Sequence, residues 1–198
     1  MRLLKDRVGQ DVRVLFVGIN PGIRSAAIGH HFAGYSNRFW KLLYESELVP
    51  EPIGTEEDGR LPKWGFGITN LVARPTPGID TLRPEEFLSG MRTLRRKVRR
   101  WQPGVVALVG VTLARVLFAR RGTGRVALGL HPERFEDAHV FVLPNPSGRN
   151  ANFSYEEMLA AFRGLRWWLA RTKSGQSRTL PRQACRESLV VSPRSEST

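Results

Sequence analysis

Two short turns rich in glycine and proline each carry an asparagine, and each directly follows an apolar run. Asn20 lies in GINPG at residues 18–22, and Asn145 lies in PNPSG at residues 144–148. An asparagine amide oxygen can orient a water molecule by accepting a hydrogen bond, but it cannot take a proton at neutral pH. Alternatively, either turn is only a tight connection, in which asparagine simply tolerates the backbone that glycine and proline set.

Asp80 is the carboxylate best placed to supply the base that Asn20 lacks. It follows RPTPG at residues 74–78, on a loop that should leave a strand at the same sheet edge as Asn20. A carboxylate there can accept a proton or stabilise a developing positive charge. The alternative interpretation is that Asp80 or Thr81 caps a helix that begins near Pro84.

The adjacent histidines His30 and His31 are the remaining candidates for chemistry. Without further ligands at a suitable spacing, the pair does not predict a metal site. The single cysteine, Cys185, cannot form an internal disulfide, a cysteine-rich zinc site or an iron-sulfur cluster. We therefore expect neither a metal nor another cofactor.

Charge is the most unusual property of the composition. The 198 residues, enough for one ordinary domain, include 31 Lys and Arg against 18 Asp and Glu, a net charge of +13. This excess points to a polyanion, and first to nucleic acid. No apolar run approaches the roughly 20 residues of a membrane-spanning helix, and the first ten residues lack a secretory apolar stretch. We expect a soluble cytoplasmic protein, associated with a bacterial nucleoid.

Strand and helix patterns alternate along the chain. Short apolar runs predict buried strands at residues 11–18, 66–71, 105–110 and 139–143. Helical spacing of apolar residues predicts helices at residues 36–48, 84–101, 112–121 and 154–169. The alternation predicts the α/β class, as a three-layer α/β/α fold with a short, mainly parallel central sheet. Such sheets carry function on loops at the carboxyl ends of strands, where both asparagine turns fall.

Several boundaries have local signals. Ser36 or Asn37 is expected to cap the helix predicted at residues 36–48, and Ser154 with Glu157 forms a capping-box pattern. The stretch 49–63, rich in Pro, Gly and Glu, predicts a surface loop.

The basic residues are concentrated in two segments. The helix from Pro84 to Arg100 carries many arginines, which either contact DNA or are only solvated. Residues 172–198 are polar, rich in Ser and Arg and interrupted by Pro, which predicts a largely disordered basic tail. The folded domain is accordingly expected to comprise residues 1–171.

The order of six motifs is more specific than any one of them. They are GINPG, then GHHF at residues 29–32, NRFWKLLYES, GITNLVARPTPG, WQP and finally LPNPSG. This set, spread over residues 14–169, resembles the mismatch-specific uracil and thymine DNA glycosylase family of the uracil-DNA glycosylase superfamily. The resemblance implies a monofunctional glycosylase of α/β/α fold, acting as a monomer on double-stranded DNA with a mismatched or damaged base. Such an enzyme flips the base out of the stack before it hydrolyses the N-glycosidic bond.

The resemblance also implies roles for residues on the first turn and the helix after it. Asn20 matches the asparagine that holds the attacking water, and Phe32 matches the aromatic residue that stacks on the flipped base. Ile19 and Ser25 match pocket-lining positions. The GHH form is similar to the thymine-excising branch, in which His31 would line the pocket or contact a phosphate.

The second turn departs from the efficient uracil glycosylases. These place a histidine ahead of Pro-Ser to stabilise the leaving base, whereas this chain has Asn145. Stabilisation of the base would then rest on backbone dipoles or on Asn145. After Pro146, Ser147 and Gly148, the bacterial uracil branch has a leucine wedge where this chain has Arg149. The resemblance implies that Arg149 enters the base stack or minor groove, unless it is only a solvated loop charge.

Two competing functions remain. A nucleotide-binding α/β protein is disfavoured because neither GxxxxGK[ST] nor GxGxxG follows a strand. A DNA-binding module without enzymatic activity is the alternative, and only the charge supports it.

Overall fold

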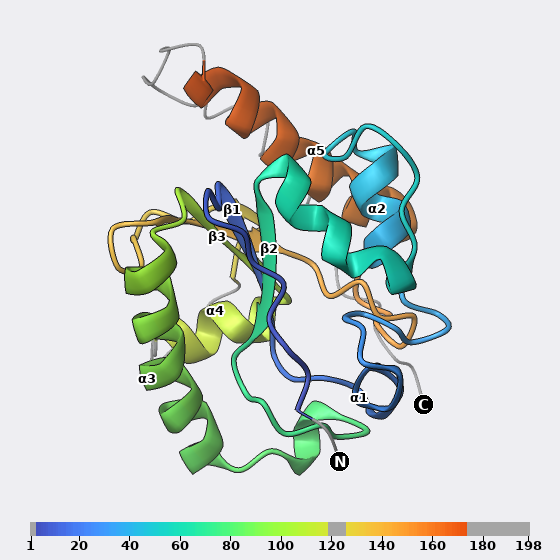
Figure 1. Ribbon diagram of the computed structural model, residues 1–198, viewed down its shortest axis with the longest axis vertical. Coiled ribbons are helices and arrows are strands. Elements are labelled where there is room, and N and C mark those ends of the chain that lie inside the picture. The colour runs from blue at the N-terminus through green and yellow to red at the C-terminus, as the bar shows by residue number, and fades with distance from the viewer. Residues whose placement is uncertain (1–2, 119–125, 174–198) are drawn as a thin grey trace, which may run out of the picture. The chain divides into compact units, whose positions relative to one another are not determined.

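The computed structural model describes residues 3–118 and 126–173 of the chain (Figure 1). Its helices and strands, with η for 3-10 helices, are β1 (Val14–Gly18), α1 (Ile23–Ile28), α2 (Phe39–Glu45), η1 (Thr55–Trp64), β2 (Phe66–Asn70), η2 (Ile79–Thr81), α3 (Pro84–Trp101), β3 (Val105–Val109), α4 (Val111–Phe118), β4 (Gly129–Leu130), β5 (His139–Leu143) and α5 (Tyr155–Lys173).

The chain divides into two compact units. The first, Met1–Trp167, contains the whole sheet. The second, Trp168–Thr198, is described only as far as the end of α5, so most of the predicted tail at residues 172–198 lies outside the described residues.

One sheet organises the first unit, with the strand order β2-β1-β3-β5-β4. All neighbours run parallel except β4, which pairs antiparallel with β5. Every residue of β1 and β3 is buried, which explains why these strands read as continuous apolar runs rather than alternating ones. The predicted fold class, a mainly parallel α/β sheet between helical layers, is confirmed.

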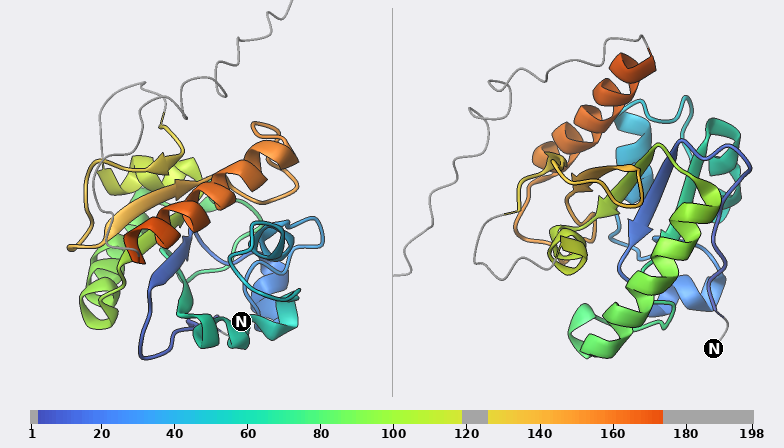
Figure 2. Two further views of the ribbon diagram at one scale, coloured as in Figure 1. Left: turned by 90° about the horizontal axis from the view of Figure 1, so that it is seen from above. Right: turned by 90° about the vertical axis from the view of Figure 1, so that its left-hand side faces the viewer.

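Helices cover both faces of the sheet (Figures 1 and 2). Leu15 and Val17 of β1 belong to a core cluster with side chains of α3 and α4. Phe16 points to the opposite face, where its ring centroid lies 5.4 Å from that of Phe39 on α2. Phe39 in turn lies 6.2 Å from Phe162 of α5. The alternation of side chains along β1 thus distributes one strand over two cores.

The prediction of a surface loop at residues 49–63 is wrong. Residues Thr55–Trp64 form η1, in which Asp58 and Leu61 are buried. Composition misled here because Pro, Gly and Glu are typical of loops, while a buried carboxylate depends on partners that are distant in the sequence.

The N-terminus of α3 also corrects an expectation. The helix begins at Pro84 as predicted, but its N-cap is Arg83, whose backbone N–H donates to Glu86 Oε2 at 2.9 Å. Asp80 and Thr81 lie in η2 instead and do not cap α3. Hydrogen bonds from the Arg74 guanidinium, and then from the Arg83 amide, lower the pKa of Glu86 to about 2. Asp80 and Thr81 are suitable cap residues by type, but the side chain of Glu86 already accepts the backbone N–H of Arg83.

The other helix starts follow the sequence more closely. Asn37 Oδ1 accepts the N–H of Phe39 at 3.0 Å, although Arg38 occupies the N-cap of α2. The capping box before α5 is confirmed, because Ser154 and Glu157 exchange two backbone-to-side-chain hydrogen bonds of 2.6 and 3.2 Å.

In residues 3–118 and 126–173, none of the helices combines the length and the apolar character that crossing a membrane requires.

Candidate active site

The loops that follow β1 and β2 run side by side beyond the sheet. The N–H of Leu71 donates to the carbonyl of Gly18 at 2.8 Å, and the N–H of Thr76 donates to that of Pro21 at 3.1 Å. These bonds continue the parallel pairing of the two strands past their carboxyl ends. GINPG and RPTPG therefore form one continuous surface, at the lower end of the molecule in Figure 1.

The loop that follows β5 joins this surface from the other side. Arg149 Nη1 donates to the Pro77 carbonyl at 3.1 Å, and the N–H of Arg38 donates to the Pro146 carbonyl at 2.9 Å. Turns that are far apart in sequence therefore meet at one edge of the sheet. The expectation that both asparagine turns share this edge is met by these contacts.

The side-chain amide of Asn20 has a fixed orientation. Its Nδ2 lies 2.7 Å from Thr76 Oγ1, 3.1 Å from the Pro21 carbonyl and 3.2 Å from that of Arg74. Since carbonyl oxygens only accept hydrogen bonds, the donating NH2 group must face these three atoms. Thr76, 3 % exposed, donates its own hydroxyl proton to the Gly78 carbonyl. Oδ1 of Asn20 is left as the acceptor that can hold a water molecule.

Asp80 lies near this network but outside it. It is exposed in η2, and its carboxylate bends back so closely on Gly78 that a side chain there would collide with it. Among the described residues, the hydrogen bonds that join Asn20 to Thr76 and Thr76 to the Gly78 carbonyl do not include Asp80. A proton transfer from water held by Asn20 would therefore need either a bridging water or a movement of η2.

Phe32 lies at the base of the first turn. Its ring stacks on that of Phe39, with centroids 4.0 Å apart and an angle of 22° between the planes. It is only half-buried, and a side chain added at Gly18 would meet its ring edge at 3.6 Å. Its backbone φ of +50° is unusual for a bulky residue, so the surrounding contacts must hold it there.

Asn70, the last residue of β2, is a site residue that the sequence did not single out. Its Oδ1 lies so close to Gly18 that a Cβ there would be 2.6 Å away, so a side chain at position 18 would displace the Asn70 amide. Its Nδ2 lies 3.4 Å from His31 Nδ1. The amide of Asn70 thus faces the same small space as the ring of Phe32.

His31 is buried, 1 % exposed, and burial lowers its pKa. Its Nε2 lies 3.0 Å from the Lys5 carbonyl, which can only accept, so the proton of the neutral ring is on Nε2. The unprotonated Nδ1 then accepts the weak hydrogen bond from Asn70. His31 therefore lies behind Asn70 and fixes which side of that amide faces outward.

Asp58 ties the GHHF segment to the chain start. Its Oδ1 lies 2.8 Å from Arg7 Nε and 3.0 Å from His30 Nδ1, and its Oδ2 accepts the N–H of His31 at 3.0 Å. Burial alone would raise the pKa of Asp58, but these three donors outweigh it and lower the pKa. The side chains of His30 and His31 thus have separate partners, Asp58 and the Lys5 carbonyl. In the described part of the chain no three His, Cys, Asp or Glu side chains gather as metal ligands would.

Ile19 and Ser25 lie close to the site, but their side chains are used for packing. The Ile19 side chain packs on the core cluster shared with α3 and α4, while its carbonyl accepts the N–H of Val72 at 2.8 Å. The buried Ser25 accepts the N–H of Ala33 on Oγ at 3.0 Å. Their contribution to a pocket is therefore through the backbone that they hold in place.

The second turn is held by its own side chains. Asn145 Oδ1 accepts the N–H of Ser147 at 3.1 Å, and the exposed Asn145 presents its Nδ2 to the outside. Gly148 lies against Ser36, and any side chain at 148 would collide with it. The turn is therefore packed tightly on the loop that precedes α2.

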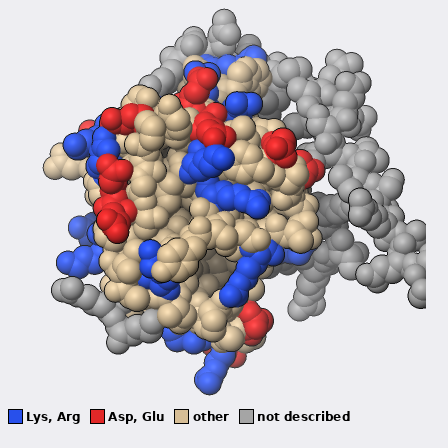
Figure 3. Space-filling model, turned by 90° about the vertical axis from the view of Figure 1, so that its right-hand side faces the viewer, with Lys and Arg blue, Asp and Glu red and all other residues tan. Residues whose placement is uncertain are grey.

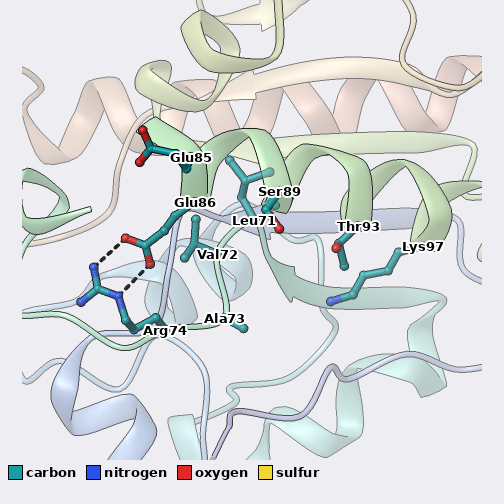
Figure 4. Close-up of a pocket in the computed structure, with 10 residues that line it drawn as sticks. Leu71, Val72, Ala73, Arg74, Glu85, Glu86, Ser89, Thr93 and Lys97 are labelled. Atoms are coloured by element: carbon teal, nitrogen blue, oxygen red, sulfur yellow. Dashed lines mark hydrogen bonds and ion pairs between the residues drawn. The ribbon is translucent and has the colours of Figure 1, made fainter. Parts of the chain in front are cut away.

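A cavity of about 380 Å³ lies elsewhere, between the segment after β2 and α3 (Figure 4). Arg74 and Glu86 form two hydrogen bonds of 2.7 Å across its mouth, and Lys97 lines its other end. None of the predicted site residues lines it. Arg74 belongs to both places, because its carbonyl contacts Asn20 while its side chain lines the cavity.

The arginines of α3 are partly neutralised. Arg95 and Arg99 each donate to the carboxylate of Glu136 at 2.5 Å, just ahead of the amino end of β5. These two residues therefore lie toward the sheet edge opposite the asparagine turns. On the side of the molecule where α1 and α2 lie, Lys and Arg side chains border an uncharged, hollowed area (Figure 3).

The fold and the position of the site identify the class of protein. The structure resembles the solution NMR structure of a candidate uracil DNA glycosylase from Methanosarcina acetivorans, with a TM-score of 0.55 and 20 % identity, covering 83 % of this chain and 98 % of that one. This likeness places the chain in the uracil-DNA-glycosylase-like fold class.

The sequence gives the family itself. Residues 6–166 match the model of the uracil DNA glycosylase superfamily, so the chain belongs to that superfamily. It is also 40 % identical over 162 residues to the G/U mismatch-specific uracil DNA glycosylase of Schizosaccharomyces pombe. That match covers 77 % of this chain and 49 % of the relative, so the chain spans about half the length of this curated relative.

Proposed function

We propose that the chain is a monofunctional DNA glycosylase that hydrolyses the N-glycosidic bond of uracil mispaired with guanine, in base-excision repair. The name of the Schizosaccharomyces pombe relative and the superfamily membership support this substrate. Thymine opposite guanine and modified uracils are further substrates of the same pocket. The enzyme acts as a monomer on double-stranded DNA in the bacterial cytoplasm, and its net charge of +13 favours association with the nucleoid.

The observation that carries the proposal is the orientation of Asn20. With Nδ2 held by Thr76 and two carbonyls, Oδ1 holds a water molecule beside the flipped nucleotide. The water oxygen bonds to C1′ of the sugar while the bond from C1′ to N1 of the base breaks. The electron pair of that bond leaves with the base, and the water proton passes to solvent or to Asp80. An amide cannot take that proton itself, so Asn20 contributes by positioning.

Recognition of the base rests on the residues around Phe32. Stacking of a base on an aromatic ring contributes about 1 to 3 kcal/mol, which offsets part of the few kcal/mol that flipping costs. Ile19, Ser25 and His31 shape the pocket behind it. Asn145 donates its amide Nδ2 to an oxygen of the leaving base and so stabilises the negative charge that develops there.

The turn of Pro146, Ser147, Gly148 and Arg149 enters the minor groove. Arg149 fills the space that the flipped base vacates, or contacts the widowed base or a phosphate, where a long cation is less rigid than an aliphatic wedge. The contact of Arg149 with the Pro77 carbonyl is exchanged for DNA in this step. The catalytic domain comprises residues 1–171, and the basic residues 172–198 add phosphate contacts.

Excision itself tests the proposal. The full chain is incubated with a duplex that contains one G·U pair, and the strand with uracil is examined for an alkali-labile abasic site. We expect product with the wild type and a large loss with Asn20→Ala. Tight binding of the duplex without product would instead identify a DNA-binding module without enzymatic activity.

A further inference from the structure

Tyr35 is the most exposed of the large hydrophobic side chains in the described residues, with 91 % of its surface accessible. It lies in the short loop between Phe32 and α2. A freely rotating tyrosine ring would lose conformational entropy when a ligand binds it, but this ring is already held in place. Tyr35 is therefore exposed and yet ordered.

Arg24 of α1 holds the ring. Its guanidinium carbon lies 4.0 Å from the centroid of the Tyr35 ring, and its Nη1 donates to the Tyr35 hydroxyl at 3.1 Å. Its Nε donates to the Ala33 carbonyl at 2.7 Å. The guanidinium thus covers one face of the ring and is itself anchored, while Nη2 still carries protons that can be donated to an anion.

The pair stands beside both parts of the proposed site. Tyr35 is three residues from Phe32, a span of at most about 10 Å along the chain. Successive nucleotides of one strand rise about 3.4 Å, so this reach corresponds to about three nucleotides from the flipped one. The loop of Tyr35 also contacts the second turn, because Gly148 packs on Ser36 and Arg38 donates to the Pro146 carbonyl.

We propose that Arg24 and Tyr35 form a second stacking and phosphate-binding site, which takes a nucleotide within three positions of the flipped one on the same DNA strand. The open face of the Tyr35 ring stacks on the base or sugar, and Arg24 Nη2 donates to the adjoining phosphate. The site secures the strand that loses its base pairing, next to the loop that carries Arg149. It rests on the proposed function for its substrate.

Binding of a product-like duplex by the full chain tests the site. The probe is a fluorescein-labelled duplex with a tetrahydrofuran abasic analogue opposite guanine, and the measurement is fluorescence anisotropy. Stacking of 1 to 3 kcal/mol corresponds to about 5- to 150-fold in Kd, so Tyr35→Ala should raise Kd by at least about fivefold. Tyr35→Phe should bind nearly as the wild type. Tyr44→Ala, which removes another exposed tyrosine at the far end of α2, is the matched control.

The phosphate contact is located separately. Single phosphates on the uracil strand are replaced by neutral methylphosphonates, one at a time, within three nucleotides of the abasic analogue. One replacement should weaken wild-type binding but leave Arg24→Gln unaffected, because that variant has already lost the contact. The inference is overturned if Tyr35→Ala binds like Tyr44→Ala. It is also overturned if Arg24→Gln is as sensitive as the wild type to every methylphosphonate replacement.

The same proteins distinguish this result from failure of the proposed function. If the wild type does not release uracil from a G·U duplex, the proposed function fails, whatever Tyr35 does. If the wild type excises uracil but Tyr35→Ala matches Tyr44→Ala in Kd, only the second site is overturned.

Discussion

The side-chain nitrogen of Asn20 lies 2.7 Å from the hydroxyl oxygen of Thr76, which joins the loop after β1 to the loop after β2. Because Thr76 passes its own proton to the Gly78 carbonyl, its lone pairs are turned toward Asn20. One buried hydroxyl therefore acts with the Pro21 and Arg74 carbonyls to set the direction in which the Asn20 amide presents its acceptor.

Thr76 is accordingly predicted to be a positioning residue. Thr76→Val keeps the shape but removes the hydroxyl, which leaves only the Pro21 and Arg74 carbonyls to hold the Asn20 amide. A misplacement of about 1 Å can cost about 100-fold in rate, so we expect a 10- to 100-fold loss of single-turnover excision on a G·U duplex. Thr76→Ser should restore most of the rate. Equal rates for the Val and Ser variants would show that the hydroxyl does not orient Asn20.

Asp80 is predicted to assist catalysis by accepting the water proton. Single-turnover excision by Asp80→Asn should fall by about 10- to 100-fold, and that of Asn20→Ala should fall further. A wild-type rate for Asp80→Asn would remove Asp80 from the mechanism.

Arg149 is predicted to contribute to the distortion of the DNA as well as to phosphate binding. Arg149→Ala is expected to lower the excision rate. If one phosphate contact is lost, the slope of the logarithm of its binding constant for duplex against the logarithm of the salt concentration should become shallower by about 0.9. Arg92→Ala, an exposed arginine on α3, removes the same charge elsewhere. The prediction fails if both variants excise uracil at the same rate.

Asp58 is predicted to stabilise the fold in a pH-dependent manner. Asp58→Asn leaves Arg7 and His30 without their carboxylate and should cost about 2 kcal/mol in urea unfolding at pH 7. Since the folded-state pKa is lowered, this contribution is present above the ordinary carboxyl pKa and is lost as the pH falls through the folded value. The difference in the free energy of unfolding between wild type and Asp58→Asn should thus close below about pH 4. Glu56→Gln, an exposed change in η1, is the control and should show no gap.

His31 should make the protein less stable in mild acid. Burial lowers its pKa from the ordinary 6.5, so the unfolded chain binds more protons below that pH. The free energy of unfolding is then expected to fall as the pH drops from 6.5. His139, whose pKa burial also lowers, contributes in the same direction. Urea unfolding from pH 5 to 8 should show a shallower slope for His31→Gln than for the wild type, and an identical slope would contradict the assignment.

The strands and the two asparagine turns could be predicted because their signals are local. Continuous apolar runs ending in Gly or Pro define β1 and β5, and parallel topology then brings Asn20 and Asn145 to one edge. The short α1 carries no such signal, since its six residues give too few turns for an apolar stripe.

The supporting residues could not be predicted in this way. Asn70, Thr76 and Asp58 matter through atoms that are between 27 and 56 positions away in the sequence, and side-chain hydrogen bonds of that range follow only from the tertiary structure. The GITN and RPTPG stretches were recognisable as motifs, and a polar residue at a strand's carboxyl end is the signal that could have drawn attention to Asn70. The capping error at Asp80 arose because a glutamate three residues after Arg83 supplied the needed acceptor.

Lys5 and Arg7, near the start of the described chain, contact both β2 and His31. Arg7 exchanges two backbone hydrogen bonds with Ile68, on the side of β2 that no other strand among the described residues covers. The Lys5 carbonyl accepts from His31. An uncovered strand edge is a template for intermolecular pairing. Detachment of residues 5–8 would therefore expose the edge of β2 and remove the Lys5 carbonyl from His31 in the same event. Resistance to aggregation is thus coupled to the integrity of the candidate site.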